Sequence, residues 1–227
     1  IDVQKGDTGK ISSGVGTFAS RIAVNAGSSV HLASNAVRDK AIKVASHMLE
    51  AAEEDMAIED GVVVVKGADL SVTLAEVARA VQGMPGFSLP GGVEPGLEAT
   101  HYFSPSQSSY CNGTAVVEVE VDPHTGHVEI VNYCMAHDSG TLINPFVVDG
   151  QVQGAVAQGV GNALLEWMVY DDNANPLSVT LAEYLLPSAP ETPNVDVTHV
   201  ESPTPINPLG VKGAGEGGTI PAAAAII

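Results

Sequence analysis

The chain has 227 residues, and its 27 Asp and Glu against 9 Lys and Arg give a formal net charge of −18 at pH 7. Proteins that bind nucleic acids or anionic membranes by neutralising phosphates concentrate positive charge on one face, so this composition excludes both classes. Hydrophobic residues make up 44% of the chain, enough to bury a core, and 24 Gly with 14 Pro predict many loops. Because no stretch of about 18 consecutive apolar residues is present, the sequence predicts no membrane span.

The first third of the chain predicts a long irregular opening, a long helix and a short strand. Residues 1–27 are rich in Gly, Ser and Thr with little apolar periodicity, which is typical of a functional or irregular loop. From residue 28 to about residue 54 apolar residues recur at helical spacing behind a Ser cap. Residues 62–65 are four consecutive valines, which predict a strand.

The middle of the chain predicts a short helix, a loop and a β-hairpin. Thr73 and Glu76 form a capping box that opens a helix to about residue 82, and the Gly- and Pro-rich residues 83–100 follow as a loop. Alternating apolar and polar residues at 115–121 and the returning run at 127–135 flank a turn, which predicts two antiparallel strands.

The last third predicts a helix of small apolar residues at about 147–170, strands at 178–181 and 195–200, and a helix beginning at Pro221. Irregular alternation of helices and strands with a hairpin predicts an α+β fold of mixed helices and small sheets. The sequence shows no clear composition break. It therefore predicts one domain over residues 1–227, with two subdomains at about 1–100 and 101–227 as the alternative.

The two cysteines predict the cellular compartment of the protein, and the two ends of the chain indicate whether the sequence is a fragment. Cys111 and Cys134 are too few for a zinc site or a disulfide framework, and we expect buried thiols in the cytoplasm. The chain does not begin with Met, and the helix predicted at Pro221 has no C-terminal cap. Both ends therefore predict a fragment of a longer protein.

Positive charge is almost absent from the second half, where Lys212 is the single Lys or Arg after Arg79. Five glycines between positions 210 and 218 surround Lys212 and would allow backbone N–H groups to approach an anionic ligand closely. The alternative is an ordinary loop lysine that pairs with a neighbouring carboxylate. The pattern is neither a Walker P-loop nor a dinucleotide-binding fingerprint.

Glu216 lies in the same glycine-rich segment. A carboxylate would repel a bound phosphate, so Glu216 is either a solvent-facing turn residue or a general base beside a reacting centre.

Other polar residues have both a structural and a functional interpretation. Gln151 and Gln158 are seven residues apart on one face of an apolar helix, where an amide needs a partner, either a planar polar ligand or a neighbouring loop. Residues 138–141 form either a ligand-binding loop or an Asx turn before that helix. Residues 12–21 form an anion cradle or an ordinary loop. The seven histidines have no zinc-ligand spacing.

Four motifs in order resemble the second molybdopterin-binding domain of the xanthine dehydrogenase and aldehyde oxidase family, most closely bacterial large subunits similar to carbon monoxide dehydrogenase. The resemblance covers essentially the whole chain. The motifs are Gly16-Thr-Phe-Ala-Ser-Arg21, Val121-Asp-x-x-Thr-Gly126, Asp138-x-Gly-x-x-Ile-Asn-Pro145 with Gly150-Gln-x-x-Gly-x-x-x-Gln-Gly159, and Asn207-Pro-x-Gly-x-Lys-Gly-x-Gly-Glu-x-Gly218. Ala19 and Ile22 depart from the family, which commonly has Gly and often has Ser there.

The resemblance implies an oxidoreductase that hydroxylates an aldehyde, an N-heterocycle or a similar carbon centre with water, or that acts on carbon monoxide. Glu216 would be its general base. The cofactor would be molybdenum-molybdopterin, in bacteria usually the cytosine dinucleotide, with the metal held through the pterin dithiolene and by no protein ligand. The implied cofactor-binding residues are Thr17, Phe18, Ala19, Ser20, Asp138, Ser139, Thr141, Gln151, Lys212, Gly213 and Gly215.

The resemblance also implies partners. The first molybdopterin-binding domain of the same subunit would complete the site, and iron-sulfur clusters and FAD on partner subunits or domains would receive the electrons. The fragment alone would then be inactive. Two alternatives are a non-catalytic binding or assembly module that keeps the fold, and an acidic ligand-binding domain unrelated to molybdenum.

Overall fold

The computed structural model describes residues 2–14, 16–83 and 88–227. It divides the chain into a first unit, Ile1–Gly27 with Ser104–Ile227, and a second unit, Ser28–Phe103. The N-terminal residues therefore belong with the C-terminal half of the chain. The loop predicted at residues 83–100 has no helix or strand where it is described, and its residues 84–87 lie outside the described residues.

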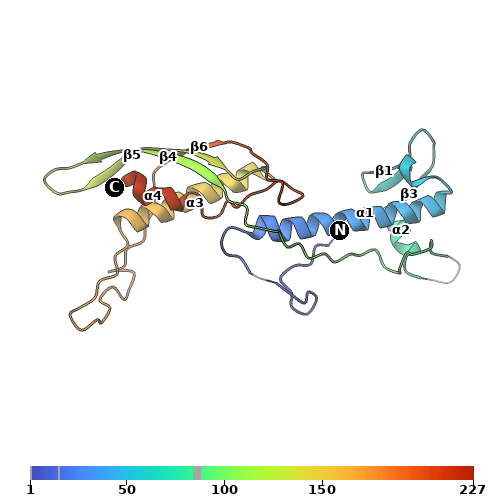
Figure 1. Cartoon of the computed structure of the whole chain (residues 1–227), viewed down its shortest axis with the longest axis horizontal. Helices are drawn as coiled ribbons and strands as arrows, with labels where there is room; N and C mark the ends of the chain where they lie inside the picture. The colour runs from blue at the N-terminus through green and yellow to red at the C-terminus, as the bar shows by residue number, and fades with distance from the viewer. Residues whose placement is uncertain (1, 15, 84–87) are drawn as a thin grey trace. The chain divides into compact units, whose positions relative to one another are not determined.

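The second unit is a long helix and a short helix packed with a small meander (Figure 1). Its core residues come from α1, β1, β2, β3 and α2, and include Val44, Val63 and Val77. After the 3-10 turn η2, the strands pair antiparallel in the order β1-β2-β3. The elements are α1 (Ser28–Leu49), η2 (Glu53–Asp55), β1 (Met56–Glu59), β2 (Val62–Val65), β3 (Ser71–Thr73) and α2 (Leu74–Ala80).

Local sequence signals account for much of this unit. The capping box at Thr73 is present, because its side chain accepts from the Glu76 N–H and the Glu76 side chain accepts from the Thr73 N–H. The predicted first helix ends five residues early, at Leu49. Strand β1 was not predicted, although Asp60 and Gly61 have φ of 45° and 83° and form the kind of two-residue turn that joins hairpin strands.

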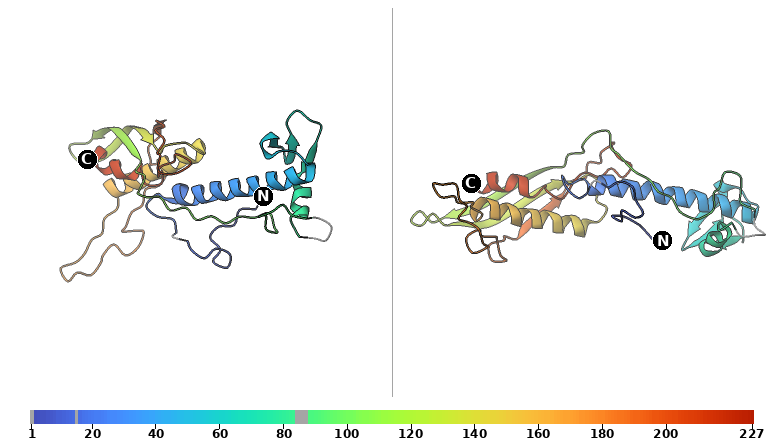
Figure 2. Two further views of the ribbon diagram at one scale, coloured as in Figure 1. Left: turned by 45° about the vertical axis from the view of Figure 1, so that its right-hand side comes forward. Right: turned by 90° about the horizontal axis from the view of Figure 1, so that it is seen from below.

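The first unit is built on a three-stranded sheet, β4-β5-β6. β4 (Asn112–Val121) and β5 (Val128–Asp138) form the predicted hairpin, and β6 (Val195–His199) pairs parallel to β5. The helices α3 (Pro145–Leu164) and α4 (Thr219–Ile226) lie side by side against one face of the sheet, as the right-hand view of Figure 2 shows. The π-helical turn η1 (Ala23–Gly27) ends the N-terminal segment.

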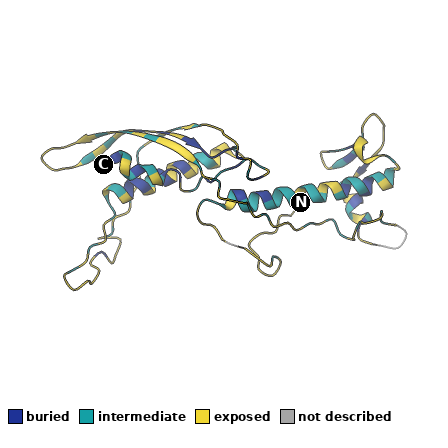
Figure 3. Ribbon diagram, in the orientation of Figure 1, coloured by how far each residue is buried: buried dark blue, intermediate teal, exposed yellow. Residues whose placement is uncertain are grey.

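The core of this unit lies between the sheet and the two helices. Buried residues from β5, α3 and α4 form one cluster, Tyr133, Met135, Val152, Val156, Val160, Ala222 and Ile226. Figure 3 shows buried positions in dark blue along both helices. On the opposite face of the sheet, Val116 and Cys134 are exposed.

Four predictions in this half need correction. Helix α3 ends at Leu164, six residues early, where the N–H groups of the next two residues both bond the Gly161 carbonyl. No strand forms at 178–181, because the Ser178 hydroxyl bonds Val169 N and Trp167 O instead. Helix α4 begins at Thr219, so Pro221 lies inside its first turn. Cys134 is exposed and Cys111 half-buried, because alternation along β5 directs Tyr133 and Met135 inward instead.

Candidate functional site

Residues that follow the end of β5 form backbone hydrogen bonds with the glycine-rich segment, residues 210–218. Gly140 and Val211 form an isolated antiparallel bridge, Thr141 N donates to the Gly210 carbonyl at 3.1 Å, and Lys212 N donates to the Ser139 carbonyl at 2.6 Å. Gly140 has φ of +70°, and a Cβ there would collide with the Gly210 carbonyl. The close approach of these two backbones therefore requires glycine at position 140.

Lys212 and Asp138 form a buried ion pair at this junction. The Lys212 Nζ lies 2.7 Å from Asp138 Oδ2, and the two side chains are 10% and 12% exposed. Ser202 joins the pair, since its hydroxyl donates to Asp138 Oδ2 and accepts from Lys212 Nζ at 2.8 Å. Asp138 Oδ1 accepts hydrogen bonds from Gly140 N at 2.8 Å and from Ser202 N at 3.2 Å. The bond from Gly140 closes an Asx turn.

These contacts set the charge state of the pair. Burial alone would raise the pKa of Asp138, but hydrogen bonds from Lys212, Ser202 and Gly140 hold the pKa well below its ordinary value. Asp138 is therefore ionised and compensates the charge of Lys212. Lys212 therefore pairs with a carboxylate, as the interpretation of Lys212 as an ordinary loop lysine required. The pair is buried, however, and its cluster anchors the glycine-rich segment to β5.

Ser20 connects the N-terminal segment to Glu216. Its Oγ donates to Glu216 Oε2 at 3.1 Å and accepts from Glu216 N at 3.0 Å. Gly213 allows the approach, because a Cβ there would lie 2.6 Å from the Ser20 carbonyl oxygen. Glu216 itself is exposed, and among the described residues the Ser20 hydroxyl is the one group that bonds its carboxylate.

The backbone that delivers Ser20 is strained. Ala19 and Ser20 have φ of 52° and 50°, in the left-handed region that favours glycine. The guanidinium of Arg21 stacks 3.9 Å from the centre of the Phe18 ring. Thr17, Phe18 and Ala19 are all exposed on this loop. Residues held in such conformations concentrate at functional sites.

The two glutamines of α3 have different surroundings. Gln151 lies at the glycine-rich segment, since a Cβ on Gly215 would be 3.5 Å from Gln151 Nε2 and 3.4 Å from Ser20 Oγ. Gln158 accepts a hydrogen bond from Thr219 Oγ1 at 3.2 Å, so it ties α3 to α4. Of the two amides, Gln151 is therefore the one beside Glu216.

Three residues around the segment were absent from the predicted set. Ser202 completes the ion pair, and Asn207 bonds the N–H and carbonyl of Val211 at 3.2 and 2.8 Å. His137 is 1% exposed, and neither of its ring nitrogens has a partner in the described part of the chain. A Cβ on Gly217 would collide with His137 Nε2. Of these three residues, only Asn207 had a signal in the sequence, because it is the first residue of the fourth motif.

A cavity of about 270 Å³ lies beside His137 and Gly217. Burial lowers the pKa of His137, and the neighbouring His199 lowers it further, so His137 is neutral. Burial also raises the pKa of the Cys111 thiol, which lines the same cavity. The cavity lining is therefore mostly uncharged.

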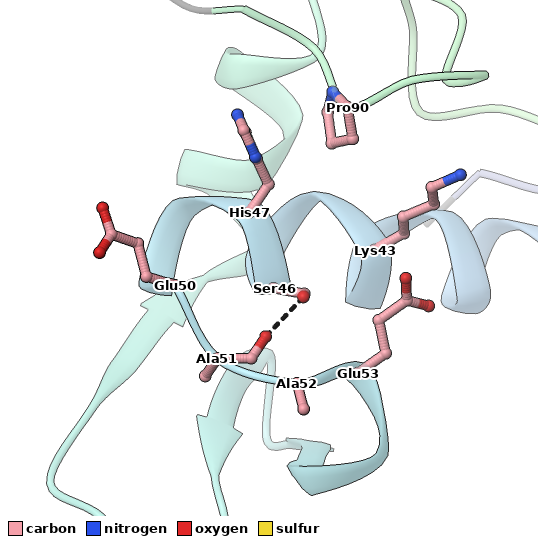
Figure 4. A pocket seen from close by; sticks show the side chains of 8 residues that line it. All are labelled: Lys43, Ser46, His47, Glu50, Ala51, Ala52, Glu53 and Pro90. Atoms are coloured by element: carbon pink, nitrogen blue, oxygen red, sulfur yellow. Dashed lines mark hydrogen bonds between the residues drawn. The ribbon is translucent and has the colours of Figure 1, made fainter.

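The second unit has its own hollow, a crevice of about 460 Å³ beside the end of α1 (Figure 4). It is lined by Lys43, Ser46, His47, Glu50, Ala51, Ala52, Glu53 and Pro90. Ser46 Oγ donates to the Ala51 carbonyl there at 2.5 Å. Every predicted site residue lies in the first unit, and none of them lines this crevice.

The candidate site thus consists of two adjoining groups in the first unit. Ser20, Gln151, Gly213, Gly215 and Glu216 come together around an exposed carboxylate, while Asp138, Ser139 and Thr141 join Lys212 at the anchor. In the described ranges no three His, Cys, Asp or Glu side chains gather where they could hold a metal ion. Among the described residues, no helix combines the length and apolarity that crossing a membrane requires.

Known proteins are similar to this chain in both sequence and fold. Residues 1–193 match the molybdopterin cofactor-binding domain family. The chain is 40% identical to the nicotine 6-hydroxylase large subunit of Paenarthrobacter nicotinovorans over 100% of its own length and 28% of that protein. It is 38% identical to the carbon monoxide dehydrogenase large chain of Hydrogenophaga pseudoflava, over 97% of this chain and 28% of that one.

A solved structure agrees with the fold. The reconstituted CO dehydrogenase from Oligotropha carboxidovorans superposes with a TM-score of 0.87 at 31% identity, over 98% of this chain and 27% of that one. The chain therefore spans little more than a quarter of the relatives it matches. The α+β arrangement of mixed helices and small sheets is that of the corresponding part of the solved enzyme. The chain belongs to the xanthine dehydrogenase and aldehyde oxidase family, as a second molybdopterin cofactor-binding domain.

Proposed function

We propose that this chain holds the molybdopterin cofactor in the large subunit of a molybdenum hydroxylase, and that Glu216 is the general base. One observation carries the proposal. The contact between Ser20 and Glu216 joins the first and last family motifs around an exposed carboxylate. If Glu216 were only a structural turn residue, it would not need a contact with a strained serine from the other end of the chain.

The residues around Glu216 fit a large polar cofactor. Gly213 and Gly215 remove side chains where Ser20 and Gln151 approach, and Gln151 is exposed with a free amide among the described contacts. Ser139 carries a buried hydroxyl without a hydrogen-bond partner among the described residues, which a cofactor oxygen or amine would satisfy. Gln151 would bond the pterin edge or a phosphate, and residues 17–20 with Ser139 and Thr141 would line the nucleotide.

Within this arrangement each residue has a separate task. When bound, the molybdenum cofactor supplies the redox centre that takes electrons from the substrate carbon. Glu216 accepts the proton released from water as the new carbon–oxygen bond forms. The Ser20 hydroxyl donates to Oε2 and leaves Oε1 of Glu216 free to take that proton. Lys212 and Asp138 fix the segment that carries Glu216, so the base keeps one position.

The wider enzyme is part of the same proposal. The two curated relatives are named for nicotine and carbon monoxide, and the substrate class proposed here is an aldehyde, an N-heterocycle or a similar electrophilic carbon. The first molybdopterin-binding domain of the same polypeptide would form the opposite wall of the site. Iron-sulfur and FAD subunits would carry electrons away, and the cofactor would be the cytosine dinucleotide form.

The test compares Glu216→Gln with Glu120→Gln in the full-length enzyme. Glu120 is exposed on β4 of the same unit and is a matched control for loss of one carboxylate. We expect both variants to retain molybdenum by mass spectrometry and cytidine nucleotide after acid release, while Glu216→Gln alone loses turnover by about 10²- to 10⁴-fold.

Two results would contradict the proposal. A fully active Glu216→Gln enzyme would remove Glu216 from the reaction. Wild-type protein without molybdenum, from a host that makes the cofactor, would instead identify a non-catalytic module.

A further inference from the structure

Two histidines meet at neighbouring strands of the first unit. His137 on β5 lies in register with His199 on the parallel strand β6, and their imidazole rings pack edge to face with centres 6.2 Å apart. Both nitrogens of His137 and Nδ1 of His199 are buried, and none of the three has a hydrogen-bond partner among the described residues. Because a buried polar group without a partner is costly, these three nitrogens require further partners.

Water suits these nitrogens better than another side chain does. His137 is 1% exposed, so a side chain from elsewhere has almost no surface by which to reach its ring. The ring centres are too far apart for a direct hydrogen bond between the imidazoles, and one water between them would bond a nitrogen of each ring. The two histidines therefore mark an internal water site.

His199 connects this water site to the surface through Asp149 on α3. The His199 Nε2 lies 2.6 Å from Asp149 Oδ1, and the two side chains are 16% and 45% exposed. Because a carboxylate oxygen accepts hydrogen bonds, this contact places a proton on Nε2 and leaves Nδ1 of the neutral ring as an acceptor. Asp149 is therefore the point at which the buried pair reaches solvent.

At the other end, His137 faces the cavity of about 270 Å³ beside Gly217, which Cys111 also lines. A Cβ on Gly217 would lie 2.4 Å from His137 Nε2 and 3.6 Å from Cys111 Sγ, so both side chains meet the residue that directly follows Glu216. Burial chiefly raises the pKa of the Cys111 thiol, and the charge of Glu216 raises it further. The cavity therefore lies within electrostatic range of the Glu216 carboxylate, and its volume has room for several waters.

We propose that His137, His199 and Asp149, with bound water, form a path that carries the proton from Glu216 to solvent. This inference rests on the proposed role of Glu216 as general base. A base that takes up a proton in every turnover has to release it before the next one. Under that proposal the cofactor and the first molybdopterin-binding domain cover the exposed face of Glu216. The proton then leaves through the interior of the first unit.

The proton moves along hydrogen bonds, and each group on the path accepts one proton and releases one. Glu216 gives its proton to water in the cavity, and that water passes a proton to Nε2 of His137, which releases another from Nδ1. The bridging water passes it to Nδ1 of His199, which releases the proton of Nε2 to Asp149 and so to solvent. Neither ring gains net charge, which agrees with the neutral state that burial imposes on His137. The two rings exchange tautomers in this step and reset before the next proton.

The test measures proton release and substrate consumption separately in the full-length enzyme with its natural subunits. During a single turnover in weakly buffered solution, a pH-indicator dye follows the proton and rapid-quench sampling follows the substrate. Asp149→Ala removes the outlet at a partly exposed side chain, and Asp196→Ala on β6 is the matched control because Asp196 is exposed on the strand that carries His199. His137→Gln keeps a polar side chain but cannot pass a proton between two ring nitrogens.

We expect proton release in Asp149→Ala and His137→Gln to fall about 10²-fold behind substrate consumption, and the two to coincide in wild type and in Asp196→Ala. Acetate is a small carboxylate that can take the place of the Asp149 side chain, so it should restore release in Asp149→Ala and not in His137→Gln. Release at the wild-type rate in Asp149→Ala, or a lag that acetate does not shorten, would overturn the inference. An equal lag in Asp196→Ala would overturn it as well.

An X-ray structure of the full-length enzyme gives a readout that needs no turnover. We expect solvent density that bridges His137 and His199, and a side chain of another domain on these nitrogens would contradict the path. A fully active Glu216→Gln enzyme would mean that the proposed function fails. An inactive Glu216→Gln enzyme together with normal proton release in Asp149→Ala would mean that only the proton path fails.

Discussion

The Ser20 hydroxyl and the Glu216 carboxylate are 196 positions apart in the chain and 3.1 Å apart in space. Ser20 both donates to the carboxylate and accepts from the Glu216 N–H, so it fixes the side chain and the backbone of the proposed base together. This double contact joins an exposed, strained N-terminal loop to a glycine-rich segment near the other end of the chain.

Removal of the Ser20 hydroxyl should therefore impair turnover without removing the cofactor. We expect Ser20→Ala and Ser20→Gly to lower kcat about tenfold, because a hydrogen bond to a charged group is worth about 1.5–3 kcal/mol and this one is partly solvated. Gly also relieves the φ of 50°, so agreement between the two variants assigns the effect to the hydroxyl. Wild-type kcat at full molybdenum occupancy in both variants would refute the assignment.

The Lys212 and Asp138 pair should control the stability of residues 205–218. Lys212→Met leaves the Asp138 carboxylate buried and unpaired, which we expect to destabilise the segment by about 3–5 kcal/mol. Hydrogen exchange measured by mass spectrometry on peptides from this segment reports the loss locally. Adding Asp138→Asn to Lys212→Met should restore part of the protection. Exchange equal to wild type in Lys212→Met would show that the pair contributes nothing.

Glycine is expected to matter at position 217 and not at position 150. A Cβ at Gly217 would collide with His137, so Gly217→Ala should destabilise the segment by about 1–3 kcal/mol. A Cβ at Gly150 meets nothing within 4 Å on α3, so Gly150→Ala should stabilise by up to about 1 kcal/mol. Exchange of peptides from residues 205–218 checks Gly217→Ala, and exchange of peptides from α3 checks Gly150→Ala. Adding His137→Ala to Gly217→Ala should recover stability, and its failure to do so would exclude this contact as the cause.

Acid should loosen the anchor in two separate pH ranges. Burial lowers the pKa of His137 below its ordinary 6.5, so the unfolded state binds a proton first and stability falls as pH drops below about 6.5. The pKa of Asp138 is also lowered, so its contribution is present above its ordinary value of 3.8 and is lost as pH falls further. Exchange of residues 205–218 measured against pH should show both ranges. His137→Leu should flatten only the upper one, and an unchanged profile would contradict the assignment to His137.

Local sequence signals predicted the elements whose stability is local. The capping box at Thr73 and the strands around residues 122–127 were confirmed because their periodicity and turn residues act within a few positions. The strand predicted at 178–181 was wrong because a single hydroxyl, Ser178, offers the backbone a different set of hydrogen bonds. The turn at Asp60 and Gly61, which joins β1 to β2, is a further local signal of this kind.

The contacts that assemble the candidate site depend on the tertiary structure. The sequence by itself made Glu216, Lys212 and the glycines around them candidates, since spacing and residue type are written in the chain. It left open whether Lys212 meets a ligand or a carboxylate, and it gave no sign that Ser202 or His137 would lie beside that segment. Asp138 is 74 positions from Lys212, and only packing of β5 against the glycine-rich segment brings them together. Contacts of that separation depend on the whole buried core, because closing such long loops costs entropy that no local pattern can offset.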